Sequence, residues 1–181
     1  MSAQKKNKPL VINLIGGPGS GKSTTMAGVF YLLKKRGVNC ELVTEYIKDK
    51  VWEEQYKVMD EQIYVLGRQH HKITRLVDKV DIVIMDTSLL SSVIYDKTKS
   101  EALKKLCLEA FNNFNNIVFF IDRSNIAYES TGRVETSEVA KTIDDEYKAL
   151  MEENNIPYTV LNNDNAVDKI IETLKKEKYI K

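Results

Sequence analysis

Short apolar runs alternate with longer amphipathic segments along most of this chain. The runs that predict strands cover residues 10–15, 40–44, 82–85, 117–121 and 157–161. The segments that predict helices cover residues 22–36, 61–79, 101–111, 137–154 and 166–178. This alternation is typical of a parallel sheet in an α/β fold, and near-continuous apolar strands indicate a sheet covered by helices on both faces.

Single residues add detail to the predicted helices. Gly37 is expected to end the first helix, and Ser100 to cap the third. The second and longest helix carries one apolar stripe, formed by Ile63, Leu66, Ile73 and Val77. His70 falls on the same stripe, where a hydrogen-bonded core histidine is more common than a catalytic one.

The chain is expected to form one domain over residues 1–181, with a flexible start at residues 1–8. In open parallel sheets, ligands bind beyond the carboxyl ends of the strands. The candidate site is therefore expected among the residues that directly follow the strands, namely residues 16–23, Glu45, Asp86, Arg123 and Asn162.

Composition narrows the classes of protein. The 181 residues include 27 Lys+Arg and 26 Asp+Glu, and a formal charge of +1 provides no general attraction to nucleic acid. No run of about eighteen apolar residues is present, so we expect no membrane span. Two cysteines cannot build a zinc cluster or a disulfide framework, and Cys40 and Cys107 predict buried, reduced thiols in a cytoplasmic protein.

The first predicted strand runs into a complete phosphate-binding motif, G-x-x-x-x-G-K-[ST]. Its residues are Gly16, Gly17, Pro18, Gly19, Ser20, Gly21, Lys22 and Ser23. The glycines let backbone N–H groups surround a phosphate, and the following helix adds its dipole. Lys22 is expected to bind the β- and γ-phosphates, Ser23 to ligate Mg²⁺ and Thr24 to bind the α-phosphate. Because no Asn-Lys-x-Asp guanine motif is present, ATP is favoured over GTP.

Two carboxylates follow predicted strands. Asp86 ends an apolar strand and is expected to hold Mg²⁺ together with Ser23. Thr87 stands where a hydrolysing ATPase often has a second acid, which favours transfer to a substrate over hydrolysis. Glu45 is a candidate for orienting or deprotonating an acceptor hydroxyl, and Asp86 is a rival for the role of base.

Two arginines are further candidates for the phosphate site. Arg133 lies in residues 124–136, a segment that could close as a lid and neutralise charge during transfer. Arg123 follows the fourth strand and could do the same, or lie near the base or phosphates of ATP. A solvated loop charge is the alternative for both arginines.

Three groups of residues permit more than one interpretation. Trp52 and Tyr56 predict either an aromatic wall for a ring-bearing substrate or core packing. The long helix has a basic face that is more typical of a solvated surface than of an anion site, formed by Arg68, Lys72, Arg75 and Lys79. His70 and His71 lack the spacing of a helical metal pair, so we expect no zinc.

The loop, the aspartate after the third strand and the chain length resemble P-loop nucleoside and nucleotide kinases. Several short motifs resemble the ribosylnicotinamide-kinase-like (NadR-type) family, including its small phage-encoded members. They are Glu45-Tyr46, Leu66-Gly67-x-Gln69, Asp86-Thr87, Gly132-Arg133 and residues 151–156. The resemblance covers roughly residues 10–175.

This resemblance implies a three-layer P-loop fold with a five-stranded parallel sheet in the order 2-3-1-4-5. It also implies ATP, Mg²⁺ and phosphorylation of a ribosyl 5′-hydroxyl. Lys22 and Ser23 would then take the nucleotide and metal roles. Asp86 would become the Mg²⁺ or base carboxylate, and Arg133 the lid arginine.

Three functions are compatible with these residues. The first is a kinase that transfers the γ-phosphoryl group of ATP to a hydroxyl, or to a phosphate, of a small nucleoside-like substrate. The second is a nucleic-acid kinase that uses the basic helix face as a track. The third is a regulatory ATPase without an acceptor, for which the sequence has no switch motif. We favour the first, and the sequence indicates no oligomeric state.

Overall fold

The computed structural model of the chain describes residues 8–123 and 137–181. Residues 1–7 of the expected flexible start and the expected lid with Arg133 lie outside the described residues. The described residues form a parallel sheet of five strands in the order β2-β3-β1-β4-β5, which confirms the order implied by the resemblance. The strands are β1 (Leu10–Ile15), β2 (Cys40–Val43), β3 (Ile82–Met85), β4 (Asn115–Asp122) and β5 (Thr159–Asn162).

Helices lie between consecutive strands and after the last one. They are α1 (Lys22–Lys35), α2 (Tyr46–Trp52), α3 (Gln62–Thr74), α4 (Ser91–Ile94), α5 (Glu101–Asn112), α6 (Ser137–Glu153) and α7 (Ala166–Lys176), with two 3-10 helices, η1 (Tyr56–Asp60) and η2 (Asn163–Asn165). All five expected helices are present, although α3 ends at Thr74 and not at residue 79, so Val77 of the expected stripe lies beyond it. Helices α2, α4 and the 3-10 helices are too short to show a period in the sequence. Both boundary signals are confirmed. Gly37 has a φ of 71° just beyond α1, and Ser100 Oγ accepts a hydrogen bond from the N–H of Leu103 at 3.3 Å.

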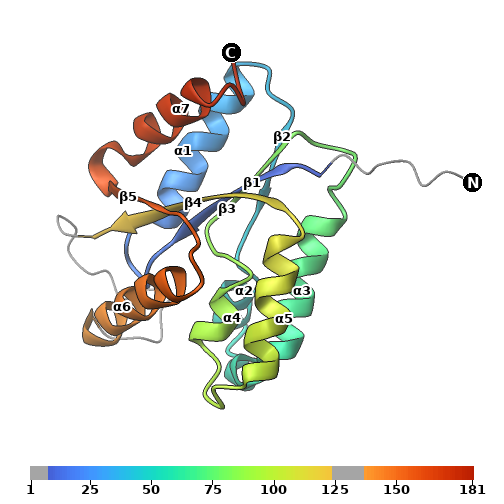
Figure 1. Cartoon of the computed structure of the whole chain (residues 1–181), viewed down its shortest axis with the longest axis vertical. Coiled ribbons are helices and arrows are strands. Elements are labelled where there is room, and N and C mark those ends of the chain that lie inside the picture. The colour runs from blue at the N-terminus through green and yellow to red at the C-terminus, as the bar shows by residue number, and fades with distance from the viewer. Residues whose placement is uncertain (1–7, 124–136) are drawn as a thin grey trace, which may run out of the picture.

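The sheet is the middle of three layers (Figure 1). Helices α1 and α7 cover one face, and α3, α4, α5 and α6 cover the other. Alternation along β1 divides its side chains between two cores: Leu10, Ile12 and Leu14 pack toward α1 and α7, whereas Val11 and Ile15 pack on the opposite face. Because both faces are covered, the central strands are apolar at nearly every position.

The apolar stripe expected along α3 is only partly correct. Leu66 and Ile73 are buried, but Ile63 is 70% exposed. The buried face instead includes two amide side chains, Gln62 and Gln69. Gln62 donates a hydrogen bond to a backbone carbonyl of η1. Gln69 accepts a hydrogen bond from the backbone N–H at the start of α2. Amide side chains can be buried in a protein core when their hydrogen bonds are satisfied. The pattern of apolar residues therefore does not identify the whole buried face of α3.

Two further features of the described chain relate to its composition. Cys40 and Cys107 are both free and buried, as predicted. Burial raises the pKa of the Cys107 thiol to about 12. Among the described residues, no helix combines the length and apolar character that a membrane crossing requires.

Candidate functional site

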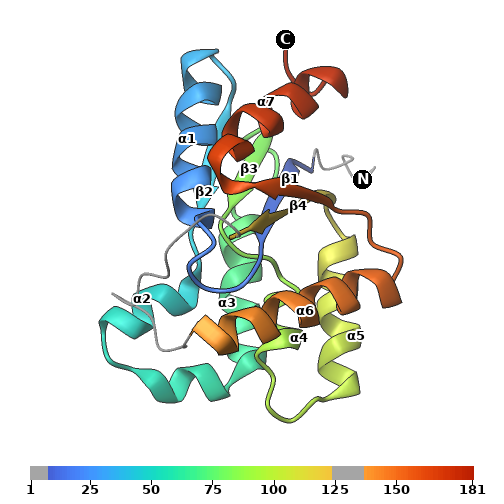
Figure 2. The ribbon, with the colours of Figure 1, turned by 90° about the vertical axis from the view of Figure 1, so that its left-hand side faces the viewer.

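A cavity of about 870 Å³ opens beyond the carboxyl ends of β1, β2 and β3. Helices α2 and α6 lie on either side of the loop that follows β1 (Figure 2). Every residue of the predicted phosphate-binding motif except Gly17 lines the cavity, together with Thr24, Glu45 and Asp86. The structure therefore gathers most of the predicted site residues around one hollow.

The loop after β1 depends on glycine for two different reasons. Gly21, at the start of α1, has a φ of 88°, which L side chains rarely adopt. At Gly17 the constraint is space, because an added Cβ atom would lie 2.3 Å from the carbonyl oxygen of Ala140. Ser20 Oγ is fully buried and has no hydrogen-bond partner among the described residues, so it is available to a ligand of the loop. The backbone of this loop and the hydroxyl group of Ser20 are therefore both suited to bind a phosphate group.

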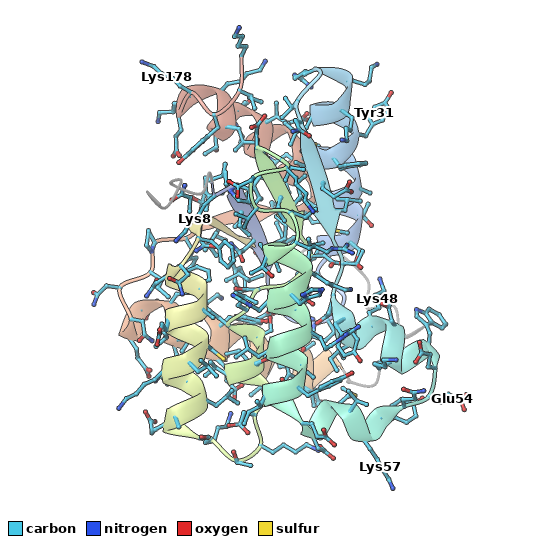
Figure 3. The ribbon with its side chains drawn as sticks, turned by 90° about the vertical axis from the view of Figure 1, so that its right-hand side faces the viewer. Lys8, Tyr31, Lys48, Glu54, Lys57 and Lys178 are labelled. Atoms are coloured by element: carbon cyan, nitrogen blue, oxygen red, sulfur yellow. The ribbon has the colours of Figure 1, made fainter. Side chains whose placement is uncertain are left out.

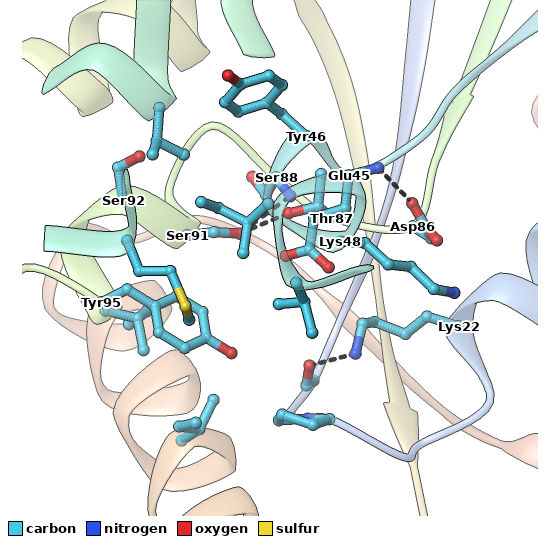
Figure 4. A pocket seen from close by; sticks show the side chains of 18 of the residues that line it. Lys22, Glu45, Tyr46, Lys48, Asp86, Thr87, Ser88, Ser91, Ser92 and Tyr95 are labelled. Carbon is cyan, nitrogen blue, oxygen red and sulfur yellow. Dashed lines mark hydrogen bonds between the residues drawn. The ribbon is translucent and has the colours of Figure 1, made fainter. Parts of the chain in front are cut away.

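Lys22 lies folded back on this loop (Figure 4). Its Nζ donates hydrogen bonds to the carbonyl oxygens of Gly16 at 2.7 Å and Gly17 at 2.8 Å. Burial lowers the pKa of Lys22, and three nearby carboxylates oppose the shift. The ammonium group is thus held at the mouth of the loop, and phosphate oxygens can replace its two carbonyl partners.

The predicted metal ligands meet directly. Ser23 Oγ donates a hydrogen bond to Asp86 Oδ2 at 2.7 Å. The backbone N–H of Glu45 donates to Asp86 Oδ1 at 2.9 Å, as Figure 4 shows. Asp86 is only 3% exposed. A hydroxyl and a carboxylate are the oxygen donors that Mg²⁺ prefers, with water and phosphate completing its shell. The donor set therefore fits Mg²⁺.

Arg123 braces the phosphate loop. Its Nη2 lies 2.7 Å from Asp144 Oδ2, and its Nη1 donates to the carbonyl of Pro18 at 2.9 Å. Asp144 Oδ1 in turn accepts a hydrogen bond from the N–H of Gly17 at 2.6 Å. The pair ties α6 to the loop, with side chains 13% and 14% exposed. Sequence reasoning missed Asp144, because it lies in an acidic helix and carries no local motif.

We expect Asp144→Ala to lower the free energy of unfolding by about 3 kcal/mol, because it leaves the Arg123 guanidinium buried without its counter-charge. Urea denaturation followed by circular dichroism measures the change. Asp145→Ala, at the exposed neighbouring position, is the matched control and is expected to change the value by less than about 0.5 kcal/mol. Equal effects of the two substitutions would contradict this role of Asp144.

Helix α3 fixes the segment that carries Glu45. Gln69 accepts a hydrogen bond from the N–H of Tyr46 at 2.9 Å and donates one to the carbonyl of Thr44 at 3.3 Å. Lys72 Nζ donates to the same carbonyl at 2.9 Å, and burial lowers its pKa. The basic face expected on this helix is therefore partly used for contacts within the molecule.

The aromatic pair of α2 and η1 lies at the rim of the cavity. Trp52 is 63% exposed and Tyr56 is 50% exposed, and both line the cavity. The alternative that they pack in the core is therefore wrong. His70 is half-buried with its ring 5.8 Å from that of Phe114, and it is not among the residues that line the cavity.

Buried hydroxyl groups form part of the cavity wall between α4 and α6. Ser91 Oγ lies 2.9 Å from Thr87 Oγ1 and accepts a hydrogen bond from the Tyr147 hydroxyl at 2.7 Å. Burial raises the pKa of Tyr147, which keeps its hydroxyl protonated. In the sequence, Thr87 is notable only because it stands where a second acid is often found, and no local pattern indicates Ser91 or Tyr147.

Comparison with known proteins agrees with this geometry. Residues 11–169 match the family AAA_28, described as an AAA domain. A search of curated proteins gave no significant match. The chain is similar in structure to a deoxyadenosine kinase from M. mycoides, with 21% identity, a TM-score of 0.60 and coverage of 92% of this chain and 99% of that one. It is also similar to a thymidylate kinase from Ehrlichia chaffeensis, with 18% identity, a TM-score of 0.65 and coverage of 93% and 99%.

The two structural likenesses show that the chain has the same fold as these two kinases. The family match spans most of the described sheet and includes the phosphate loop, Asp86 and Asp144. The chain therefore belongs to the AAA_28 family of AAA domains.

Proposed function

We propose that this protein is a kinase that uses ATP and Mg²⁺ to phosphorylate a small nucleoside-like substrate. The proposal rests on one observation. The phosphate loop, the Ser23–Asp86 pair and Glu45 meet at one end of a cavity of about 870 Å³. That volume leaves room for an acceptor beside the nucleotide. The similar solved structures are a deoxyadenosine kinase and a thymidylate kinase, which supports phosphoryl transfer as the class of reaction.

The residues of the loop would bind the nucleotide. Lys22 would exchange its two carbonyl partners for oxygens of the β- and γ-phosphates, and the backbone N–H groups would surround the phosphates. Ser23 and Asp86 would hold Mg²⁺, which when bound neutralises phosphate charge. Arg123 would act indirectly, by keeping the loop in shape through Asp144.

In the transfer step, the acceptor hydroxyl oxygen forms a bond to the γ-phosphorus. The bond from that phosphorus to the β,γ-bridging oxygen breaks, and its electron pair leaves with ADP. We assign the hydroxyl proton to the Glu45 carboxylate, whose backbone N–H is anchored on Asp86. Arg133 stays a prediction for the lid, outside the described residues.

The acceptor is proposed to carry a ring that packs against Trp52 and Tyr56 at the cavity rim. A ribosyl nicotinamide meets this requirement, and the NadR-type resemblance favours it. The buried free thiols of Cys40 and Cys107 are consistent with a reducing compartment, and we propose the cytoplasm.

A panel of acceptors tests the proposal. The purified protein is incubated with Mg²⁺ and γ-labelled ATP, together with nicotinamide riboside, ribo- and deoxynucleosides, their monophosphates or an oligonucleotide with a 5′-hydroxyl. We expect the label to move to one small molecule. Label that moves only to the oligonucleotide would favour a nucleic-acid kinase. Release of free phosphate that no acceptor changes would contradict the kinase function.

A further inference from the structure

The first turn of α2 directs two charged side chains toward the phosphate loop. Glu45 directly precedes the helix, Lys48 lies in its first turn, and both residues line the cavity. Lys48 Nζ donates a hydrogen bond to Ser23 Oγ at 3.2 Å. Figure 4 shows the side chains of Lys48 and Lys22 beside each other at the loop. Sequence reasoning had not assigned any role to Lys48.

Lysines supply the cations of the cavity wall within the described residues. These lining residues are Lys22, Lys48, Lys57 and Lys97. Lys97 is paired with Asp60 at 2.5 Å, and Lys57 points outward at the end of the molecule remote from the loop (Figure 3). Of these four, only Lys22 and Lys48 make hydrogen bonds to residues of the phosphate-binding motif.

We propose that Lys48 is a second catalytic lysine, whose ammonium group contacts the phosphoryl group during its transfer. This inference rests on the proposed kinase reaction. Its present partner, Ser23 Oγ, is the oxygen assigned to the metal, so Lys48 releases that oxygen when nucleotide and metal bind. The four-carbon stem of a lysine lets the ammonium group move to a nearby phosphate oxygen.

Lys22 and Lys48 would then act from two directions. Lys22 approaches from the loop itself, and Lys48 approaches from α2, the side on which Glu45 lies. Charge is spread over the three equatorial oxygens of the phosphoryl group in transit, and a cation fixed beside them accelerates transfer. Lys48 contributes charge and hydrogen bonds, and it takes no part in the proton transfer assigned to Glu45.

Binding of a transition-state mimic tests this role without any acceptor. The affinity of the protein for ADP with Mg²⁺ is measured by calorimetry in the presence and absence of aluminium fluoride, which mimics the transferring phosphoryl group. We expect Lys48→Met to weaken binding of the fluoride complex about 100-fold and binding of ADP alone less than about threefold. In the acceptor assay we expect kcat to fall about 100-fold, and Lys48→Arg to restore it to within about tenfold.

Lys50→Met is the matched control, because Lys50 lies on the same helix and pairs with Glu53 at 2.5 Å outside the cavity. It is expected to bind both complexes like the wild type. Unchanged binding of the fluoride complex by Lys48→Met, or an equal loss for ADP alone, would overturn the assignment. If binding of the fluoride complex depends on Lys48 but the protein labels no acceptor, the contact of Lys48 with the phosphoryl group is retained and its role in transfer to an acceptor falls with the proposed kinase reaction.

Discussion

Lys22→Ala is expected to lower the rate of phosphoryl transfer by about 1000-fold or more. The ammonium group of Lys22 lies partly buried at the mouth of the loop, held by two carbonyl oxygens that phosphate oxygens can replace. Its removal takes away the cation that binds the β- and γ-phosphates, and the backbone N–H groups alone cannot supply that charge. Single-turnover transfer from γ-labelled ATP to the acceptor found in the panel measures the effect.

Lys34→Ala provides the control for this experiment. Lys34 lies in the last turn of α1, the helix that Lys22 begins, and its side chain is exposed over the ring of Phe30. We expect normal transfer by this variant, and thermal melting curves show whether both variants are folded. Near-normal transfer by Lys22→Ala would reject the assignment of the phosphate loop.

Asp86→Asn is expected to lower Mg²⁺-dependent transfer by about 100-fold or more. The asparagine oxygen can still accept the hydrogen bond from the N–H of Glu45, so the junction between β2 and α2 is expected to persist. Its amide nitrogen cannot accept a hydrogen bond from Ser23 Oγ or carry the charge that a divalent ion needs. Transfer measured across a range of Mg²⁺ concentrations tests this, and the half-saturating concentration should rise.

Glu45→Gln is the informative comparison for Asp86→Asn. Because the contact of residue 45 with Asp86 is made through its backbone, this variant keeps the contact. We expect its ATP affinity to stay within about threefold of the wild type while transfer to the acceptor falls. Loss of ATP binding by Glu45→Gln would instead assign Glu45 to the nucleotide side of the cavity.

The pattern of apolar and polar residues predicted the strands, the helices and the class of the fold, because these depend mainly on residues that are close in the sequence. Residues 10–15 form a strand because both of its faces are buried, and the alternation of runs and amphipathic segments was sufficient for the α/β class. The face of α3 could not be predicted in the same way. Gln69 is buried because it meets the N–H of Tyr46 on another helix, which no count of apolar residues reveals.

The same distinction applies to the site. The phosphate loop is visible in the sequence because its glycines, Lys22 and Ser23 act within eight consecutive residues, where chain geometry alone brings them together. Asp86 could be predicted as well, since parallel strands end at the same edge of a sheet. Both predictions needed only local spacing and the class of the fold.

Tertiary structure alone decided which other groups reach the loop. Asp144 accepts a hydrogen bond from the N–H of Gly17 across 127 positions of sequence, and Arg123 pairs with Asp144 and is not among the residues that line the cavity. Lys48 meets Ser23 only because α2 packs beside the loop. Such contacts depend on how helices are packed, and packing is set by the whole core rather than by any short pattern. The chain thus specifies its nucleotide loop locally and the surroundings of that loop through its complete fold.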